Sequence, residues 1–182
     1  FIISVHNEAQ VIEEKLANAL ALDYPQDRLD IMIISDASDD ETDAIVEEWA
    51  KKHPPIRLVR QHQRRGKTAG LNAGIRQSTS DIIIFSDANA MYKKDAVSEL
   101  VKYFAMPDTG YVMGAALYTD ASESEASQSE GLYWKFELAL KKLETKFHSV
   151  VGGDGAIYAI RRELYWPLED DDINDFVNPL QI

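Results

Sequence analysis

An apolar run that ends abruptly in polar residues constrains this chain more than any other feature. Residues Ile82–Phe85 are all β-branched or aromatic, and Asp87 and Asn89 follow at once. Such a run is typical of a strand buried on both faces of a parallel sheet. Ligands of open α/β sheets bind just beyond the carboxyl ends of the strands. There, oxygens two residues apart suit a hard divalent cation on a phosphorylated ligand. The alternative is a helix cap, since Asp and Asn both cap well.

The composition indicates a globular domain that is not built for nucleic acid. The chain has 182 residues, 45% of them apolar and 27% charged, which suits one domain with a hydrophobic core. A net charge of -12 argues against a nucleic-acid surface, which needs a basic patch. The absence of cysteine excludes disulfides and thiolate zinc sites. An anionic ligand would therefore be held by a metal or by a few local cations.

The beginning of the chain indicates a piece of a longer protein. It opens without a methionine or a signal peptide, already inside the strand-like run Phe1–Val5. We therefore expect further elements in the parent. No apolar run in these 182 residues approaches the length that spans a bilayer, so this piece is expected to be soluble.

Strand-like and helix-like segments alternate through the first half of the chain. This order predicts an α/β fold with right-handed crossovers, a mainly parallel central sheet, helices on both faces and a mixed second half. There is no internal repeat and no clear linker, so we expect one domain. The expected strands are Phe1–Val5, Ile31–Ile34, Ile56–Val59, Ile82–Phe85, Tyr111–Leu117 and Ala156–Ile160, and the expected helices are 9–22, 42–52, 68–77, 96–104 and 132–147.

Three of these strands end in polar residues of similar type. Asn7 and Glu8 follow the first, Asp36 the second, and Asp87 the fourth. Because parallel strands share their carboxyl edge, these side chains are expected to meet in one crevice. Arg65 and Lys67 lie just before a predicted helix, where backbone amides and the helix dipole favour anions. The combination suits a nucleotide diphosphate with a metal. The alternative for the basic stretch is a solvated loop.

Six motifs in order resemble family-2 glycosyltransferases with the GT-A fold. The last two also resemble the membrane-embedded branch that includes hyaluronan, chitin, cellulose and poly-N-acetylglucosamine synthases. Together the motifs span almost the whole chain. They are His6-Asn7-Glu8, Ser35-Asp36-Ala37-Ser38-Asp39, Gly66-Lys67-Thr68-Ala69-Gly70-Leu71-Asn72, Asp87-Ala88-Asn89, the run from Glu130 to Glu137, and the run from Gly155 to Arg162.

The resemblance implies a nucleotide site at the expected crevice. Asp36 matches the acid that hydrogen-bonds the uracil ring, and Val5 and Glu8 match residues that flank the base pocket. Lys67 and Arg65 match basic contacts near the nucleotide. The resemblance thus divides the chain into a nucleotide-binding half, 1–90, and an acceptor half, 91–182, which stops before the family's Gln-x-x-Arg-Trp segment.

The resemblance also implies a metal site and a catalytic base. Asp87 and Asn89 match the two ends of an Asp-x-Asp motif that binds Mg²⁺ or Mn²⁺ on the diphosphate, and Asp175 matches the general base. Asn89 replaces an acid, so the site loses a charge, and Asn174 likewise replaces the acid beside the base. Asp172 is the alternative base if the register shifts. The rest of the acidic run Glu169–Asp172 is expected to be solvated.

The function implied by the resemblance is inverting sugar transfer. The donor would be a UDP-sugar, with N-acetylglucosamine favoured, and the acceptor a glycan or another hydroxyl. The parent's catalytic domain would face the cytoplasm, between transmembrane helices outside this chain. The alternative is a degenerate module that binds a nucleotide or glycan without turnover. A dinucleotide dehydrogenase is disfavoured because residues 6–11, after the first strand, lack Gly-x-Gly-x-x-Gly.

Overall fold

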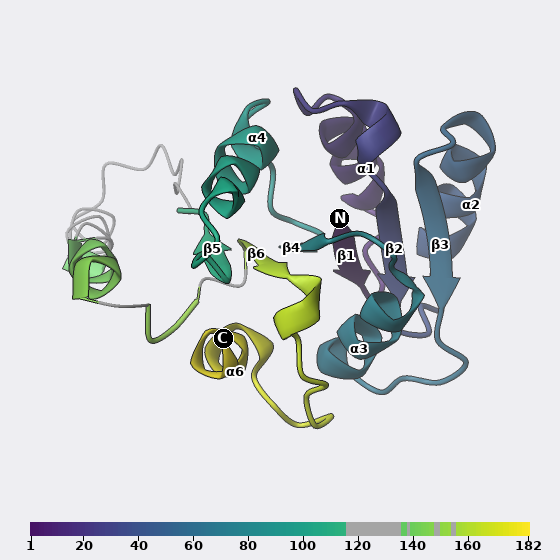
Figure 1. Cartoon of the computed structure of the whole chain (residues 1–182). Helices are drawn as coiled ribbons and strands as arrows, with labels where there is room; N and C mark the ends of the chain where they lie inside the picture. The colour runs from purple at the N-terminus through teal and green to yellow at the C-terminus, as the bar shows by residue number, and fades with distance from the viewer. Residues whose placement is uncertain (116–135, 138, 148–149, 154–155) are drawn as a thin grey trace, which may run out of the picture.

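A computed structural model describes residues 1–115, 136–137, 139–147, 150–153 and 156–182. One six-stranded sheet has the order β3-β2-β1-β4-β6-β5 (Figure 1). The first four strands in that order are parallel, β6 is antiparallel to β4, and β5 is antiparallel to β6. This confirms a mainly parallel sheet with a mixed second half. The strands are β1 Ile2–Val5, β2 Ile31–Ser35, β3 Ile56–Arg60, β4 Ile82–Asp87, β5 Tyr111–Met113 and β6 Ile157–Arg161.

Helices cover both faces of the sheet, as expected. One hydrophobic cluster lies between the sheet and helices α1, α2 and α4, and a second packs under α3 and reaches the C-terminal end of α6. Consecutive strand residues enter opposite clusters, as Ile33 and Ile34 do, which explains the unbroken apolar runs. The helices are α1 Ile12–Leu20, α2 Thr42–Lys52, α3 Lys67–Gln77, α4 Ala96–Val101 and α6 Asn174–Gln181, with 3₁₀ turns at Gln26–Arg28, Lys102–Ala105 and Arg162–Leu164. Residues 136–137 and 139–147 are also helical.

Two glycines bring α3 unusually close to the sheet. A Cβ on Gly70 would lie 3.0 Å from Ile34 Cγ2, and one on Gly74 would lie 3.1 Å from the Cδ1 atoms of Ile2 and Ile34. Larger residues at these positions would push the helix outward. The glycines therefore set the height of α3, and with it the place of its N-terminus above the carboxyl ends of β1 and β4.

Some element boundaries differ from the sequence expectation. Helix α1 begins at Ile12 rather than at residue 9, because residues 9–11 form a turn in which Asp40 Oδ2 accepts a hydrogen bond from the Ala9 N–H. Helix α6 was not expected at all. The polar segment 120–130 and the start of the helix expected at 132 lie outside the described residues. Within the part of the chain that is described, no helix is long and apolar enough to cross a membrane.

Candidate active site

The strand register brings the predicted polar residues to one edge of the sheet. Val5 of β1 pairs with Ser35 of β2, and Ser4 pairs with Asp87 of β4. Asp36 therefore follows the end of β2 at the same edge as Asp87, and the Asp36 N–H donates to the Val5 carbonyl over 2.9 Å. Val5 is buried at the end of β1, the strand that lies between β2 and β4. The expected gathering of strand ends is confirmed for these residues.

Asp36 fastens the basic loop to the end of β2. Its Oδ1 accepts hydrogen bonds from Gln61 Nε2 at 2.9 Å and from the Arg65 N–H at 2.8 Å, and its Oδ2 accepts one from the Gly66 N–H at 2.9 Å. Gly66 has a φ of +89°, a conformation open to glycine at little cost, and directly precedes α3. The Asp36 side chain is 5% exposed and retains a lone pair on Oδ2 for a further donor.

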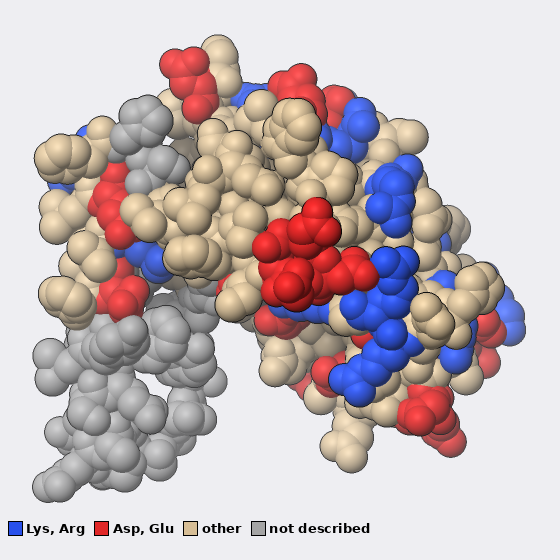
Figure 2. Space-filling view, turned by 90° about the horizontal axis from the view of Figure 1, so that it is seen from below, with Lys and Arg blue, Asp and Glu red and all other residues tan. Residues whose placement is uncertain are grey.

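Two basic side chains reach from this loop toward acids. Lys67, the first residue of α3, forms an ion pair with Asp87, and both side chains are about one-third exposed, at 36% and 37%. Arg65 forms an ion pair with Asp170 at 2.7 Å. Figure 2 shows acidic and basic side chains gathered side by side on this face. A diphosphate arriving here would meet two cations already held by carboxylates, together with the N-terminal amides of α3.

The protein oxygens at the end of β4 fit a divalent cation whose other ligands are phosphate and water oxygens. Asp87 supplies a carboxylate and Asn89, exposed in the turn that follows, supplies an amide oxygen. Among the described residues, no group of three His, Cys, Asp or Glu side chains could enclose an ion. Mg²⁺ and similar ions are commonly held by one or two protein oxygens, with phosphates and water completing the shell. The residues present match that mode.

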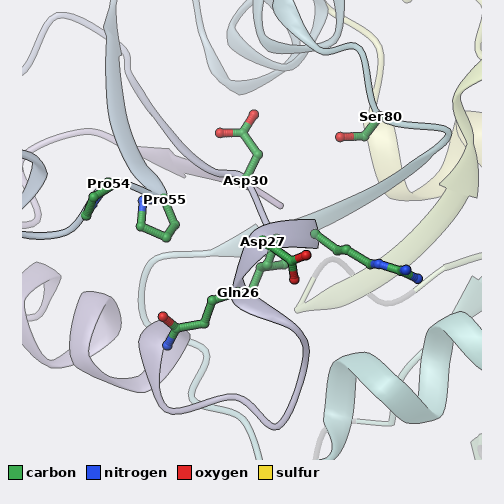
Figure 3. A pocket seen from close by; sticks show the side chains of 8 residues that line it. Gln26, Asp27, Asp30, Pro54, Pro55 and Ser80 are labelled. Atoms are coloured by element: carbon green, nitrogen blue, oxygen red, sulfur yellow. The ribbon is translucent and has the colours of Figure 1, made fainter.

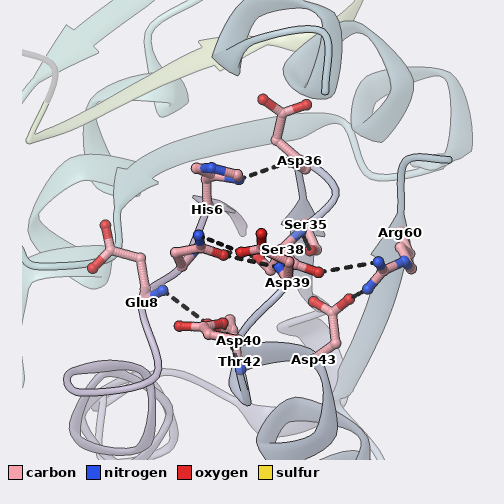
Figure 4. Close-up of polar contacts among 11 residues, drawn as sticks. His6, Glu8, Ser35, Asp36, Ser38, Asp39, Asp40, Thr42, Asp43 and Arg60 are labelled. Atoms are coloured by element: carbon pink, nitrogen blue, oxygen red, sulfur yellow. Dashed lines mark hydrogen bonds and ion pairs between the residues drawn. The ribbon is translucent and has the colours of Figure 1, made fainter. Parts of the chain in front are cut away.

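Hydrogen bonds from side chains join the loops after β1 and β2 (Figure 4). Sequence reasoning had assigned no structural role to these side chains. Asn7 Nδ2 donates to Asp39 Oδ1 at 2.6 Å, and the Asp39 N–H donates back to Asn7 Oδ1 at 3.0 Å. Asn7 has a φ of 55°, which Asn tolerates better than most residues. The Glu8 N–H donates to Thr42 Oγ1 at 2.8 Å. Figure 4 shows the carboxylates of Asp36 and Glu8 pointing away from the joined loops.

Asp175 lies in the first turn of α6, which a buried polar network attaches to β6. Asn174 Nδ2 and Asn178 Nδ2 donate to the Tyr158 hydroxyl at 2.9 and 2.8 Å. Tyr158 pairs with Phe85 of β4, two residues before Asp87. Burial raises the pKa of the Tyr158 hydroxyl, which keeps it neutral. Asn174 therefore faces the core. The asparagine that replaces the acid beside the predicted catalytic base thus attaches α6 to β6.

A proline inside α6 explains a second contact near Asp175. Pro179 has no N–H to donate to the carbonyl four residues earlier, which is that of Asp175. The Gly153 N–H donates to this carbonyl instead, at 2.7 Å. The Asp175 side chain is partly exposed. Its orientation toward Asp87 stays a prediction.

Hydrogen bonds tie the segment before α6 to α3. Asn72 of α3 bonds the backbone of Leu168 twice, at 2.8 and 3.2 Å. Thr68 Oγ1 donates to the Asp172 carbonyl at 2.8 Å, and Asp172 Oδ2 accepts from the Glu169 N–H at 2.8 Å. With the Arg65–Asp170 pair, these bonds attach the backbone of the acidic run to α3, while the side chains of Glu169, Asp170 and Asp171 are exposed, as expected. The bonds place Asp175 three residues from a point fixed on the first turn of α3.

Helix α1 contributes two residues that sequence reasoning missed. Lys15 is fully buried and donates to the Ala90 carbonyl, just after Asn89. Asn18 bonds both the N–H and the carbonyl of Tyr92 at 2.9 Å. The available signal was a lysine in the apolar stripe of a helix, beside Leu16.

A hollow of about 440 Å³ lies at the opposite edge, where the strands begin (Figure 3). Asp30, Pro55 and Ser80 line it just before β2, β3 and β4. Arg57 already bonds the Asp30 carboxylate through Nε and Nη2, at 2.9–3.2 Å. Ligand sites of open α/β sheets lie at the other edge, so this hollow is not assigned to the chemistry.

A family model and several known proteins are similar to this chain. The protein-family model that is described as glycosyl transferase family 2 matches residues 1–168. The β-monoglucosyldiacylglycerol synthase of Synechocystis sp. is 29% identical over 157 residues, which cover 85% of this chain and 32% of that protein. The poly-β-1,6-N-acetyl-D-glucosamine synthase of Staphylococcus epidermidis is 32% identical over 115 residues, 63% of this chain and 27% of that protein. The chain thus spans a third or less of these curated relatives.

A solved structure resembles almost the whole chain. It is mannosyltransferase PcManGT from Pyrobaculum calidifontis, in complex with GDP-Man and Mn²⁺. The two superpose with a TM-score of 0.82 at 31% sequence identity, over 96% of this chain and 48% of that chain. The resemblance to GT-A glycosyltransferases expected from the motifs is therefore confirmed.

Proposed function

The chain belongs to glycosyl transferase family 2 and has the GT-A fold, and from this premise we propose that it is an inverting hexosyltransferase. It would move a sugar from a UDP-sugar to a glycan or another hydroxyl acceptor. N-acetylglucosamine is the favoured sugar, and the relative that makes poly-β-1,6-N-acetyl-D-glucosamine supports this choice. Residues 1–90 would bind the donor and residues 91–182 the acceptor.

The observation that carries the proposal is the convergence of Asp36, Lys67 and Asp87 on one edge of the sheet. Asp36 holds the loop that ends at Gly66, and Lys67 meets Asp87 across the end of β4. The nucleobase of the donor would lie against Asp36, with Val5 and Glu8 beside it. The diphosphate would take over Lys67 and Arg65 from their carboxylate partners.

The proposed mechanism is a single displacement carried out by this chain's own side chains. Asp175 takes the proton from the acceptor hydroxyl, which then attacks the sugar from the face opposite the diphosphate and inverts the anomeric centre. Sugar transfer passes through an oxocarbenium-like state, as glycoside hydrolysis does. Lys67 and Arg65 hold the phosphates in line. When bound by Asp87 and Asn89, Mg²⁺ or Mn²⁺ supplies positive charge that stabilises the departing diphosphate.

A second donor is favoured by one observation. The solved structure at 31% identity is a mannosyltransferase in complex with GDP-Man. GDP-mannose would use the same phosphate contacts and differ at the base, where Asp36 would meet a guanine instead of a uracil.

A module without turnover is the remaining alternative. Asn89 lowers the charge at the metal site, and the second substitution, Asn174, is used for packing. Asn174 is buried and bonds the Tyr158 hydroxyl, so its substitution has a structural use and is not by itself a sign of lost turnover. For the parent protein we propose a catalytic domain on the cytoplasmic face of a membrane, as the resemblance of its last two motifs to membrane-embedded synthases implies.

Calorimetric titration of the purified chain with UDP, GDP and ADP, each with and without Mn²⁺, tests the proposal. We expect UDP to bind at least about tenfold tighter than ADP, and Mn²⁺ to strengthen that binding. Tighter GDP binding would support the mannose donor. Equal affinity for all three nucleotides, independent of Mn²⁺, would contradict the proposal.

A further inference from the structure

A buried lysine lies directly beneath the turn that carries the predicted metal ligands. Lys15 is 0% exposed, although it comes from a helix whose neighbouring buried residues are apolar. Its ammonium donates to the Ala90 carbonyl and lies 3.9 Å from the centroid of the Tyr92 ring. Burial lowers the pKa of Lys15 to about 7, while the nearby Asp87 carboxylate opposes that shift. Burying a charge is costly, so such a position needs a compensating reason.

The same helix face holds the far end of the turn. Asn18, one helical turn after Lys15, donates from Nδ2 to the Tyr92 carbonyl and accepts from the Tyr92 N–H on Oδ1, both at 2.9 Å. The Tyr92 hydroxyl donates to Ser86 Oγ within β4. The segment between Ser86 and Tyr92 is therefore anchored on the strand at one end and on α1 at the other.

We propose that Lys15 is a positioning residue for the donor site, with Asn18 as its partner. Lys15 fixes the Ala90 carbonyl toward α1, and so fixes the backbone turn from which Asp87 and Asn89 present their oxygens to the donor diphosphate and its cation. The inference rests on the proposed function of this edge. It adds a residue from a helix on which none of the predicted ligands lies.

The substitution of Asn89 for an acid explains why such support matters here. An amide oxygen binds a hard cation more weakly than a carboxylate, so the cation's charge does less to organise the turn. A turn set in advance by Lys15 and Asn18 removes that ordering from the cost of binding. Residues that orient metal ligands typically contribute about 10–100-fold to metal affinity or activity.

Lys15→Met distinguishes positioning from packing, because methionine keeps most of the volume and removes the charge and the donor. The Ala90 carbonyl loses its partner, while the cost of a buried ammonium disappears. We expect a melting temperature equal to or above that of the parent. In the ligand-free chain, we expect faster amide hydrogen exchange at residues 89–92. Lys15→Arg should keep the exchange rates nearer the parent, and Lys102→Met, at an exposed lysine paired with Glu99, is the matched control.

The second readout is UDP affinity at saturating Mn²⁺, which we expect to fall about 10–100-fold in Lys15→Met and to stay unchanged in Lys102→Met. Parental exchange rates at residues 89–92, or parental UDP affinity, in Lys15→Met would overturn the inference. A loss of melting temperature in proportion to the loss of affinity would also overturn it, since that would indicate packing alone. If the parent bound no nucleotide, the proposed function would fail, while the exchange measurement on the ligand-free chain would still decide whether Lys15 fixes the turn. Asn18→Ala gives a second variant that removes only the far anchor.

Discussion

At the scale of single residues, the site is built from side chains that organise the backbone as well as face a ligand. Asp36 accepts three hydrogen bonds from the loop at residues 61–66, so truncation would disturb the loop together with the nucleotide binding that we propose for this residue. Asp36→Ala is expected to remove most of the affinity for UDP. The structure predicts a loss of stability as well, because the Arg65 and Gly66 N–H groups and Gln61 Nε2 would lose their acceptor.

Asp36→Asn is the more informative change. Rotating the amide cannot restore both acceptors, so one N–H of the loop faces a donor, and we expect a loss of about 1–3 kcal/mol in the free energy of unfolding. UDP affinity should fall at least about tenfold, measured by calorimetry. Asp81→Asn, at an exposed acid before β4, serves as the control. If Asp36→Asn bound UDP as tightly as the parent does, Asp36 would be excluded from the nucleobase site.

The metal ligands make an opposite pair of predictions. Asp87→Ala should abolish the enhancement of UDP binding by Mn²⁺, because it removes the one charged ligand. Asn89→Asp should tighten Mn²⁺-dependent binding by about tenfold, since it restores a charged oxygen. Titration of Mn²⁺ at fixed UDP measures both. If neither variant changes the metal dependence, the ion is held elsewhere or is not used.

At the scale of elements, sequence predicted the strand ends well and the last helix not at all. Apolar β-branched runs that end in Asp or Asn identify the strands and their carboxyl ends, because burial on both faces leaves little other choice of residue. Helix α6 lacks such a signal. It contains Pro179 and two buried asparagines, Asn174 and Asn178, and is held by the Tyr158 hydroxyl and the Gly153 N–H, contacts between distant parts of the chain.

The segment before α6 is held by contacts of different strength. The Arg65–Asp170 pair is about half exposed on both sides, so it contributes on the order of 0–1 kcal/mol and can yield to a phosphate. The bonds from Asn72 to Leu168 are buried and are expected to persist. A bound nucleotide sugar would thus displace Asp170 from Arg65 without detaching the segment from α3.

The prediction for the catalytic base concerns Asp175 in α6. Asp175→Asn keeps the shape of the side chain but cannot accept the proton, so we expect UDP affinity to be nearly unchanged and turnover by the full-length enzyme to fall about 10²–10⁴-fold. Release of UDP in the presence of acceptor measures the rate. Asp172→Asn is the companion variant, since Asp172 bonds the Glu169 N–H and is expected to affect the rate little. Near-parental turnover in Asp175→Asn, with loss in Asp172→Asn, would exchange their roles.

At the scale of the whole molecule, strand order determines where the pieces meet. The chain passes from β1 to β2 and β3, and then returns to place β4 on the other side of β1. The strand order reverses between β1 and β4, and such points hold ligands in doubly wound sheets. Sequence predicted which residues reach the carboxyl edge but not this order, because any order of parallel strands buries the same apolar runs.

The charge of the whole chain also bears on the site. A net charge of -12 would repel a nucleotide sugar, yet the basic residues near α3 form a local patch beside the acids (Figure 2). Affinity for a diphosphate therefore depends on short-range contacts at this edge rather than on the overall field, which salt screens within about 10 Å.

Paramagnetic relaxation by Mn²⁺ in the presence of UDP tests the location of the donor site most directly. With assigned amide resonances of the purified chain, we predict that Mn²⁺ and UDP together broaden the signals of residues 65–68 and 87–90. The signals of residues 26–30, which line the hollow at the opposite edge, should keep their widths. Broadening at residues 26–30, with residues 87–90 unaffected, would contradict the account.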